Sequence, residues 1–190
     1  GSVLANDSIS GSGTLNLIGS QLGTVSNPVA VTGGLSVVLQ NNATLYADLS
    51  GSTGSVTFDT NTQNTLVLDD VGATINTAFY GVSEKSLFVI SAADGVVPVS
   101  ANWTQNADTG SWTVQINSST GTIVTLDDVH TANGFIPGTA SFSQDSAGNY
   151  ILSESNASSS GTVTSAAPFT DTTNTSPAGL TYFYDSTQTP

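Results

Sequence analysis

Two pairs of adjacent aspartates are the residues in this chain best suited to chemistry. Asp69-Asp70 and Asp127-Asp128 each bring two carboxylates together, and paired carboxylates act as acid and base in glycoside hydrolysis. Adjacent residues on a strand point to opposite faces, however, so neither pair can converge on one bond. At a turn, these four side chains could bind calcium together with backbone oxygens. The alternative is two solvated turns, since the glycine-rich calcium-binding nonapeptide repeat is absent.

The chain has one histidine, His130, and one Lys or Arg, which is Lys85. A lone histidine cannot form a metal site built on several histidines. A Ser-His-Asp arrangement stays formally open, but the Gly-x-Ser-x-Gly motif around a nucleophilic serine does not occur. We interpret His130 as a surface or turn residue. Lys85 is expected in a turn beside Glu84, and an isopeptide bond with a buried asparagine is the alternative.

Aromatic side chains offer another kind of site, because flat rings can stack on sugars. The candidates are Trp103, Trp112, Tyr46, Tyr80 and the cluster Tyr182–Tyr184. Aromatic residues are only 7% of the chain, and such side chains more often fill a core or an interface. Carbohydrate binding is therefore an alternative function and not the main expectation.

The charge balance excludes several classes of function. The chain carries 14 acidic residues against one Lys or Arg, which gives a formal net charge of −13. Such a polyanion cannot neutralise phosphates, so we expect no nucleic-acid partner, and anionic lipid would repel it. A β-helical enzyme acting on acidic sugars would need Arg or Lys to hold the substrate carboxylates. With no Cys there is no thiolate chemistry, and we expect no cofactor apart from calcium.

The composition also predicts a folded, exported protein. Charged residues make up 8% of the chain and hydrophobic residues 37%, and disordered chains lack such apolar content. No apolar run approaches the roughly 20 residues of a membrane span, so we expect no membrane insertion. A surface rich in Ser, Thr, Asn and Gly with scarce Lys points to a bacterial protein that is secreted or displayed on the cell surface.

Short strand-like runs recur every 8–12 residues or so, which predicts an all-β protein. No stretch has a helical period with capping residues. A parallel β-solenoid (β-helix) is favoured because clear two-residue hairpin turns are missing from roughly the first 70 residues, and an antiparallel β-sandwich is the alternative. The expected strands are Leu15–Ile18, Pro28–Val31, Leu35–Leu39, Thr44–Leu49, Ser55–Phe58, Thr65–Leu68, Leu87–Ile90, Val97–Trp103, Ser111–Ile116, Thr122–Leu126, Ala140–Phe142 and Tyr150–Leu152.

An internal repeat relates residues of about 53–92 to residues 109–155. Thr53–Phe58 matches Thr109–Val114 at an offset of 56 positions, and Leu68–Val71 matches Leu126–Val129 at an offset of 58. In a solenoid, this offset would correspond to about three coils, with Asn and Thr in the coil turns.

The sequence divides into an N-terminal arm (1–10), a β domain (11–155) and a Ser/Thr/Pro-rich C-terminal arm (156–190). Both arms carry apolar residues that a solvated linker would not need. They could pack on their own domain or add to a neighbouring subunit as strands. The residues expected to mediate self-association are Val3, Leu4, Ile9, Phe169, Leu180, Tyr182, Phe183 and Tyr184.

The stretch Asn64–Val71, followed by Ile75–Gly81 and Leu87–Ile90, resembles a pattern in large secreted proteins of acetic-acid-type alphaproteobacteria. In that family, a Leu-rich rung ending in acidic residues precedes an Ile…Gly-Phe turn and another apolar rung. The resemblance covers roughly residues 55–155 and the ending, although Ser83–Lys85 replaces the usual acidic turn. A self-cleaving Hint (hedgehog/intein-like) domain often follows such a β-rich passenger. The resemblance therefore implies cleavage after Pro190, and it carries over no catalytic residue.

These features together predict a structural subunit of an extracellular fibre or biofilm matrix that polymerises with itself, without enzymatic activity. A monomeric surface adhesin or carbohydrate-binding module, with cell-surface or matrix polysaccharide as partner, is the alternative. A β-helical enzyme that cleaves neutral glycans would need two distant carboxylates to converge in a cleft.

Overall fold

The computed structural model describes residues 8–69 and 71–157, which form two β-sheets around one apolar core and a single 3-10 turn, η1 (Ala92–Asp94). Sheet A contains, in spatial order, β1 (Ser8–Ser10), β4 (Val29–Thr32), β6 (Thr44–Asp48), β8 (Asn64–Leu68), β10 (Ser86–Ile90), β15 (Tyr150–Asn156) and β14 (Pro137–Gln144), with β3 (Gln21–Leu22) also paired to β6. Sheet B contains β11 (Pro98–Gln105), β12 (Trp112–Ser118), β13 (Gly121–Thr131), β9 (Thr74–Val82), β7 (Ser55–Phe58), β5 (Leu35–Gln40) and β2 (Gly13–Ile18).

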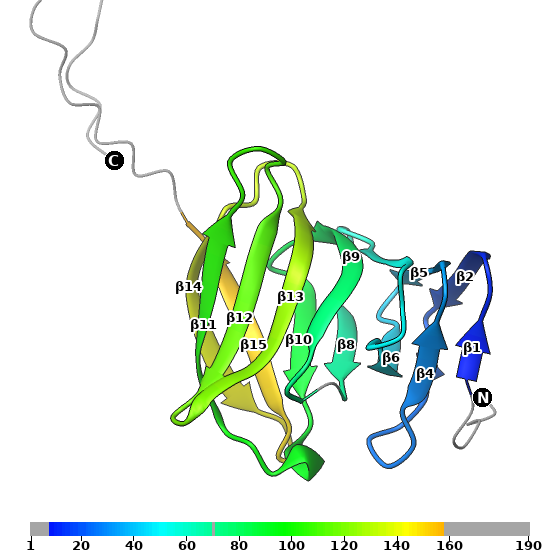
Figure 1. The fold of residues 1–190 in the computed structure, drawn as a ribbon, viewed down its shortest axis with the longest axis horizontal. Helices are drawn as coiled ribbons and strands as arrows, with labels where there is room; N and C mark the ends of the chain where they lie inside the picture. The colour runs from blue at the N-terminus through cyan, green and yellow to red at the C-terminus, as the bar shows by residue number, and fades with distance from the viewer. Residues whose placement is uncertain (1–7, 70, 158–190) are drawn as a thin grey trace, which may run out of the picture. The chain divides into compact units, whose positions relative to one another are not determined.

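The strands from β1 to β10 form a parallel β-solenoid of about four turns, as the sequence predicts. The chain alternates between the sheets, and each strand pairs in parallel with the strand one coil later (Figure 1). Ala30 pairs with Asp48, 18 residues on, and Ser55 pairs with Ala78, 23 residues on. Each coil therefore takes about twenty residues, and coils of slightly different length stack in one register.

The C-terminal strands change from parallel to antiparallel pairing. Antiparallel pairing is the kind expected for a β-sandwich, the alternative fold. β11 pairs with β12, and β12 with β13, in antiparallel fashion, while β13 joins the solenoid by running parallel to β9. β15 runs antiparallel to both β10 and β14. β11 and β14, the outer strands of the two sheets, contact each other. We call β11, β12, β14 and β15 the C-terminal cap, because they cover the end of the core.

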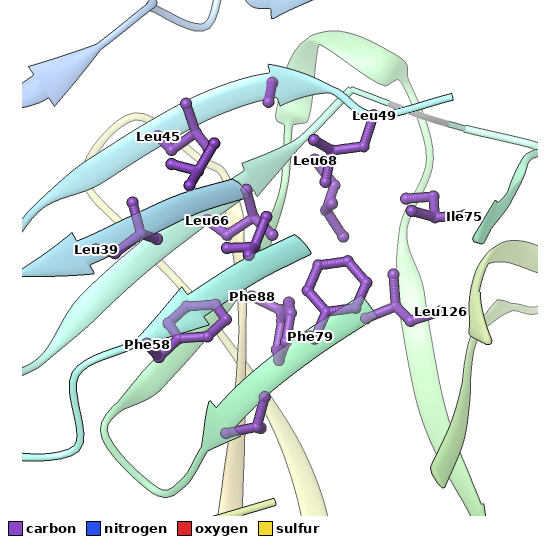
Figure 2. Packing of buried hydrophobic residues seen from close by; sticks show 14 of the residues in the cluster. Leu39, Leu45, Leu49, Phe58, Leu66, Leu68, Ile75, Phe79, Phe88 and Leu126 are labelled. Atoms are coloured by element: carbon purple, nitrogen blue, oxygen red, sulfur yellow. The ribbon is translucent and has the colours of Figure 1, made fainter. Parts of the chain in front are cut away.

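The core is built from apolar side chains that occupy equivalent positions in successive coils and stack on one another. Strict alternation in Leu35–Gln40 buries every second side chain, as expected for one face of a strand. Between the sheets, the Phe88 ring packs edge-to-face against Phe58 at 5.4 Å and against Phe79 at 5.8 Å between ring centroids (Figure 2). Such edge-to-face pairs stabilise a core beyond the area they bury.

Asparagine side chains fix the turns between coils. Asn64 is fully buried, and its Oδ1 accepts a hydrogen bond from the Ala43 backbone N–H one coil earlier, at 3.0 Å. Its Nδ2 donates to the Asp59 and Thr62 carbonyls of its own turn, at 3.2 and 3.1 Å. Its backbone N–H donates to the Lys85 carbonyl one coil later. One residue thereby joins three successive coils, which supports the expectation that Asn and Thr suit the coil turns.

Several sequence-based expectations about local structure are wrong. Ile75–Gly81, expected as a turn, lies within the nine-residue strand β9. Ser8–Ser10, assigned to the N-terminal arm, forms β1 in sheet A. The two halves of the sequence repeat occupy different settings, since Ser55–Phe58 is a parallel solenoid strand whereas Ser111–Val114 leads into antiparallel β12. Within the described residues, no helix has the length and apolar character to cross a membrane.

Replacing Asn64 with alanine should destabilise the fold by about 1–3 kcal/mol, because the buried Ala43 N–H loses its partner. Denaturant unfolding followed by far-UV circular dichroism measures this change. Asn61→Ala is the matched control, since the Asn61 side chain bonds to Asp59 on the exposed surface of the same turn; its effect should stay within about 0.5 kcal/mol. Equal effects of the two substitutions would contradict the role of Asn64.

Candidate functional site

The first coil of the solenoid, Ser8–Leu22, presents strand edges without a partner among the described residues. We call it the N-terminal coil. β2 pairs with β5 alone, β1 with β4 alone, and the two-residue strand β3 with β6 alone. An unpaired strand edge is a template for pairing with another chain. The N-terminal coil is therefore the first candidate for a functional surface.

The apolar side chains of the N-terminal coil are incompletely covered. Leu17 is buried, but Ile9, Leu15 and Leu22 are only half-buried where they pack on the core. On the outer face of sheet B, the Ile18 side chain is 56% exposed. At the opposite end of the core, the outer strands β11 and β14 likewise leave apolar residues half-buried, among them Trp103 and Phe142. Incomplete cover of apolar residues is therefore common to both ends of the core.

Charge is distributed just as unevenly. No Asp, Glu, Lys, Arg or His occurs between Ser8 and Ala47, although the chain as a whole carries −13. The region from β11 to β15 contains Asp108, Asp127, Asp128, Asp145 and Glu154. The N-terminal coil itself therefore carries no charged residue, and it lies in sequence between Asp7 and Asp48 at the end of β6.

A hydrogen bond between a tryptophan and a glutamate joins the two sheets within the C-terminal cap. Trp103 Nε1 on β11 donates to Glu154 Oε1 on β15 at 2.6 Å, and the Trp112 ring packs edge-to-face against Trp103 at 6.2 Å. The other carboxylate oxygen, Oε2, is buried without a hydrogen-bond partner. Burial raises the pKa of Glu154 to about 7, and the Trp103 hydrogen bond only partly offsets this rise. Both tryptophan side chains pack within the cap, so neither ring is an exposed surface on which a sugar could stack.

The predicted calcium ligands lie on different sheets and do not form one site. Asp69 follows β8 in sheet A, Asp127 and Asp128 belong to β13 in sheet B, and Asp70 lies outside the described residues. Among the described residues, no group of three or more acidic or histidine side chains has a metal-binding arrangement. Calcium binding stays a prediction.

Coil stacking places Asp69 near two other acids, Asp48 at the end of β6 and Asp94 in η1. Partial loss of solvent is the main cause that raises the pKa of Asp69, and the charge of Asp48 adds to it. The pKa of Asp94 is raised by burial, by the charge of Asp69 and by a hydrogen bond between the two carboxyl groups.

His130 was expected at the surface or in a turn, and it is a partly exposed residue of strand β13 and not a turn residue. Its Nε2 is 3.0 Å from Asp128 Oδ1, and its ring stacks on Tyr80 of the neighbouring β9, with centroids 4.7 Å apart and an interplanar angle of 14°. Asp127 accepts a hydrogen bond from Thr113. Because His130 covers one face of the Tyr80 ring, the exposed Tyr80 offers at most its other face to a sugar. Tyr46 is half-buried beside Val67 on sheet A.

Lys85 lies at the rim of a cavity of about 230 Å³, lined by Thr60, Glu84, Asn133, Phe135 and Asn156 among others. Its Nζ donates to the Asn61 carbonyl at 3.0 Å and is exposed to solvent, which is the turn lysine that the sequence predicts. Asn156 is already committed, accepting from the Ile136 N–H and donating to the Gly134 carbonyl. The amide oxygen and nitrogen of Asn156 thus already have partners within the protein.

Most residues expected to mediate self-association cannot be placed. Ile9 lies in β1 at the open edge, while Val3, Leu4, Phe169, Leu180, Tyr182, Phe183 and Tyr184 lie outside the described residues.

Comparison with protein-family models, curated proteins and solved structures found no match. The function of this chain is therefore inferred from its own geometry.

The buried glutamate predicts a stability that falls as pH rises. The pKa of Glu154 is higher in the folded state than in the unfolded chain, so its contribution is complete below about pH 4.5 and is lost as pH rises through about 7. Allowing for solvent screening of this half-buried group, we expect a loss on the order of 1–2 kcal/mol. The unfolding free energy of the wild type, measured from pH 4.5 to 8, should therefore fall more steeply with pH than that of Glu154→Gln, which cannot ionise. Equal slopes for the two proteins would show that Glu154 plays no part.

Proposed function

We propose that this chain is a structural subunit of an extracellular fibre or biofilm matrix, secreted from the cell, which assembles with itself and catalyses no reaction. The observation that carries the proposal is the N-terminal coil, whose open strand edges and half-covered apolar residues lie in a region without charge. A durable two-sheet core behind that surface suits a mechanical role.

The edge strands lack the features with which proteins usually prevent association. Natural edges carry lysines, prolines, inward-pointing charges or bulges that block pairing with another chain. β2 contains none of these residues and pairs with β5 in an unbroken register over six residues. β1 also contains none of them, but it is only three residues long, and a short edge strand offers few groups for pairing. Retention of an unprotected edge supports a role for that edge in contact with another chain.

The positions of the acidic groups favour assembly over catalysis. Asp69 follows a strand of sheet A and the Asp127-Asp128 pair lies on sheet B, whereas glycoside hydrolysis needs two carboxyl groups that flank one bond, about 5–10 Å apart. Glu154 has a raised pKa, as a general acid would, but its Oε1 is held by Trp103 inside the cap. No second carboxylate shares that interior among the cap contacts described above.

Negative-stain electron microscopy of the full chain tests the proposal. We expect polymers whose amount rises between low salt and physiological salt, because the Debye length shrinks to about 8 Å and screens the net charge. Samples with calcium and with chelator, at equal ionic strength, separate screening from calcium binding. Dispersed particles at every salt and calcium concentration would contradict the proposal. Dispersed particles that bind matrix polysaccharide would support a monomeric adhesin instead.

A further inference from the structure

We infer that the N-terminal coil docks onto the same coil of a second copy of this chain, across a two-fold axis, so that both sheets continue as antiparallel strands through the junction. The inference rests on the proposed self-assembly and assigns its first contact. It concerns a surface, β1 with β2, that pairs on one side only among the described residues.

The unpaired backbone groups of two strand edges, one in each sheet, must find partners at the same end of the solenoid. β1 ends sheet A, β2 ends sheet B, and the half-buried Ile9, Leu15 and Leu22 lie with the core between them. A single added strand would cover one edge and leave the other exposed. A second N-terminal coil presents both edges at matching separation, because it is the same structure. Self-complementarity of this kind is what a two-fold interface requires.

The free backbone groups of β2 are arranged for antiparallel pairing. The Gly19 N–H donates to the Gln40 carbonyl of β5 at 2.9 Å. Because the N–H and C=O of alternate residues point to opposite sides of a strand, those of Asn16 and Ile18 point away from β5. In an antiparallel pair, one residue exchanges both its N–H and its C=O with its partner. Each of these residues therefore carries a complete donor and acceptor pair for a second copy.

Electrostatics selects this end over the other. Docking two N-terminal coils brings together segments that carry no charged residue from Ser8 to Ala47, and Asp7 is the acid nearest to them in sequence. The C-terminal cap carries more acids, with Asp108 and Asp145 in its loops and Glu154 in β15. Like charges brought close together repel each other, so the N-terminal coil is the end with less local repulsion between two copies.

A proline at Asn16 tests the junction. Proline is tolerated on an edge strand where the N–H faces outward, so Asn16→Pro should remove the donor offered to the second copy and leave pairing with β5 intact. We expect sedimentation equilibrium to show a dimer that is weakened about ten- to a hundredfold by Asn16→Pro. Asn16→Ala, which keeps the N–H, should dimerise as the wild type does. An unchanged thermal transition establishes that the proline variant is folded.

Cross-linking locates the contact independently. The chain contains no cysteine, so a single introduced thiol reports on one position. Thr14→Cys or Asn16→Cys should be joined into covalent dimers by a short bis-maleimide, whereas Thr57→Cys, on the interior strand β7, should not. Equal dimer yields at Asn16 and Thr57, or none at positions 14 and 16, would overturn the inference.

The two proposals fail in different ways. Dimers that respond to Asn16→Pro but never form polymers would refute the fibre and leave the junction standing. Polymers that persist unchanged in Asn16→Pro would refute the junction and leave the fibre standing. A wild-type chain that stays monomeric at every concentration and salt would overturn both.

Discussion

The register in which one coil stacks on the next is the constraint on which the remaining structure depends. Side chains alternate between the two faces of a strand, so a slip of one residue would turn every buried side chain outward. The ladder from Leu17 through Leu39 to Phe58 exists only in the observed register. Asn64 holds that register at the turns by bonding to the coils before and after it. Packing and turn chemistry therefore specify the same stack.

A parallel stack has no intrinsic end, and the C-terminal cap shows how this chain ends it. The strands reverse direction from β10 to β15 and from β13 to β12, and register irregularities interrupt the pairing in β11, β12 and β13. Such bulges bend strands and increase their twist, which lets β11 reach β14 across the core. The Trp103–Glu154 hydrogen bond then links the sheets at the point where they meet.

Local alternation could be predicted from sequence, whereas contacts between distant residues could not. Leu35–Gln40 shows a pure period of two and was expected as a strand. β9 was missed because Thr77 and Gly81 interrupt its apolar pattern. Thr77 is nevertheless buried, and its hydroxyl donates to the Ser52 carbonyl, while a Cβ atom at Gly81 would clash with the Phe58 carbonyl oxygen. Similarly, nothing around Glu154 in sequence indicates a buried acid, since its partner is 51 residues away.

The asymmetry between the two ends limits what kind of assembly can grow. A two-fold junction between N-terminal coils uses the open edges of β1 and β2, and the resulting pair leaves the outer strands of the C-terminal cap, β11 and β14, at its ends. Closed symmetry of this kind gives a dimer and not a filament. Growth beyond the pair would then require a second, different contact. The apolar residues Phe169, Leu180, Tyr182, Phe183 and Tyr184 are the part of the chain whose composition suits that contact, so a fibre would be built from dimers joined through their C-terminal segments.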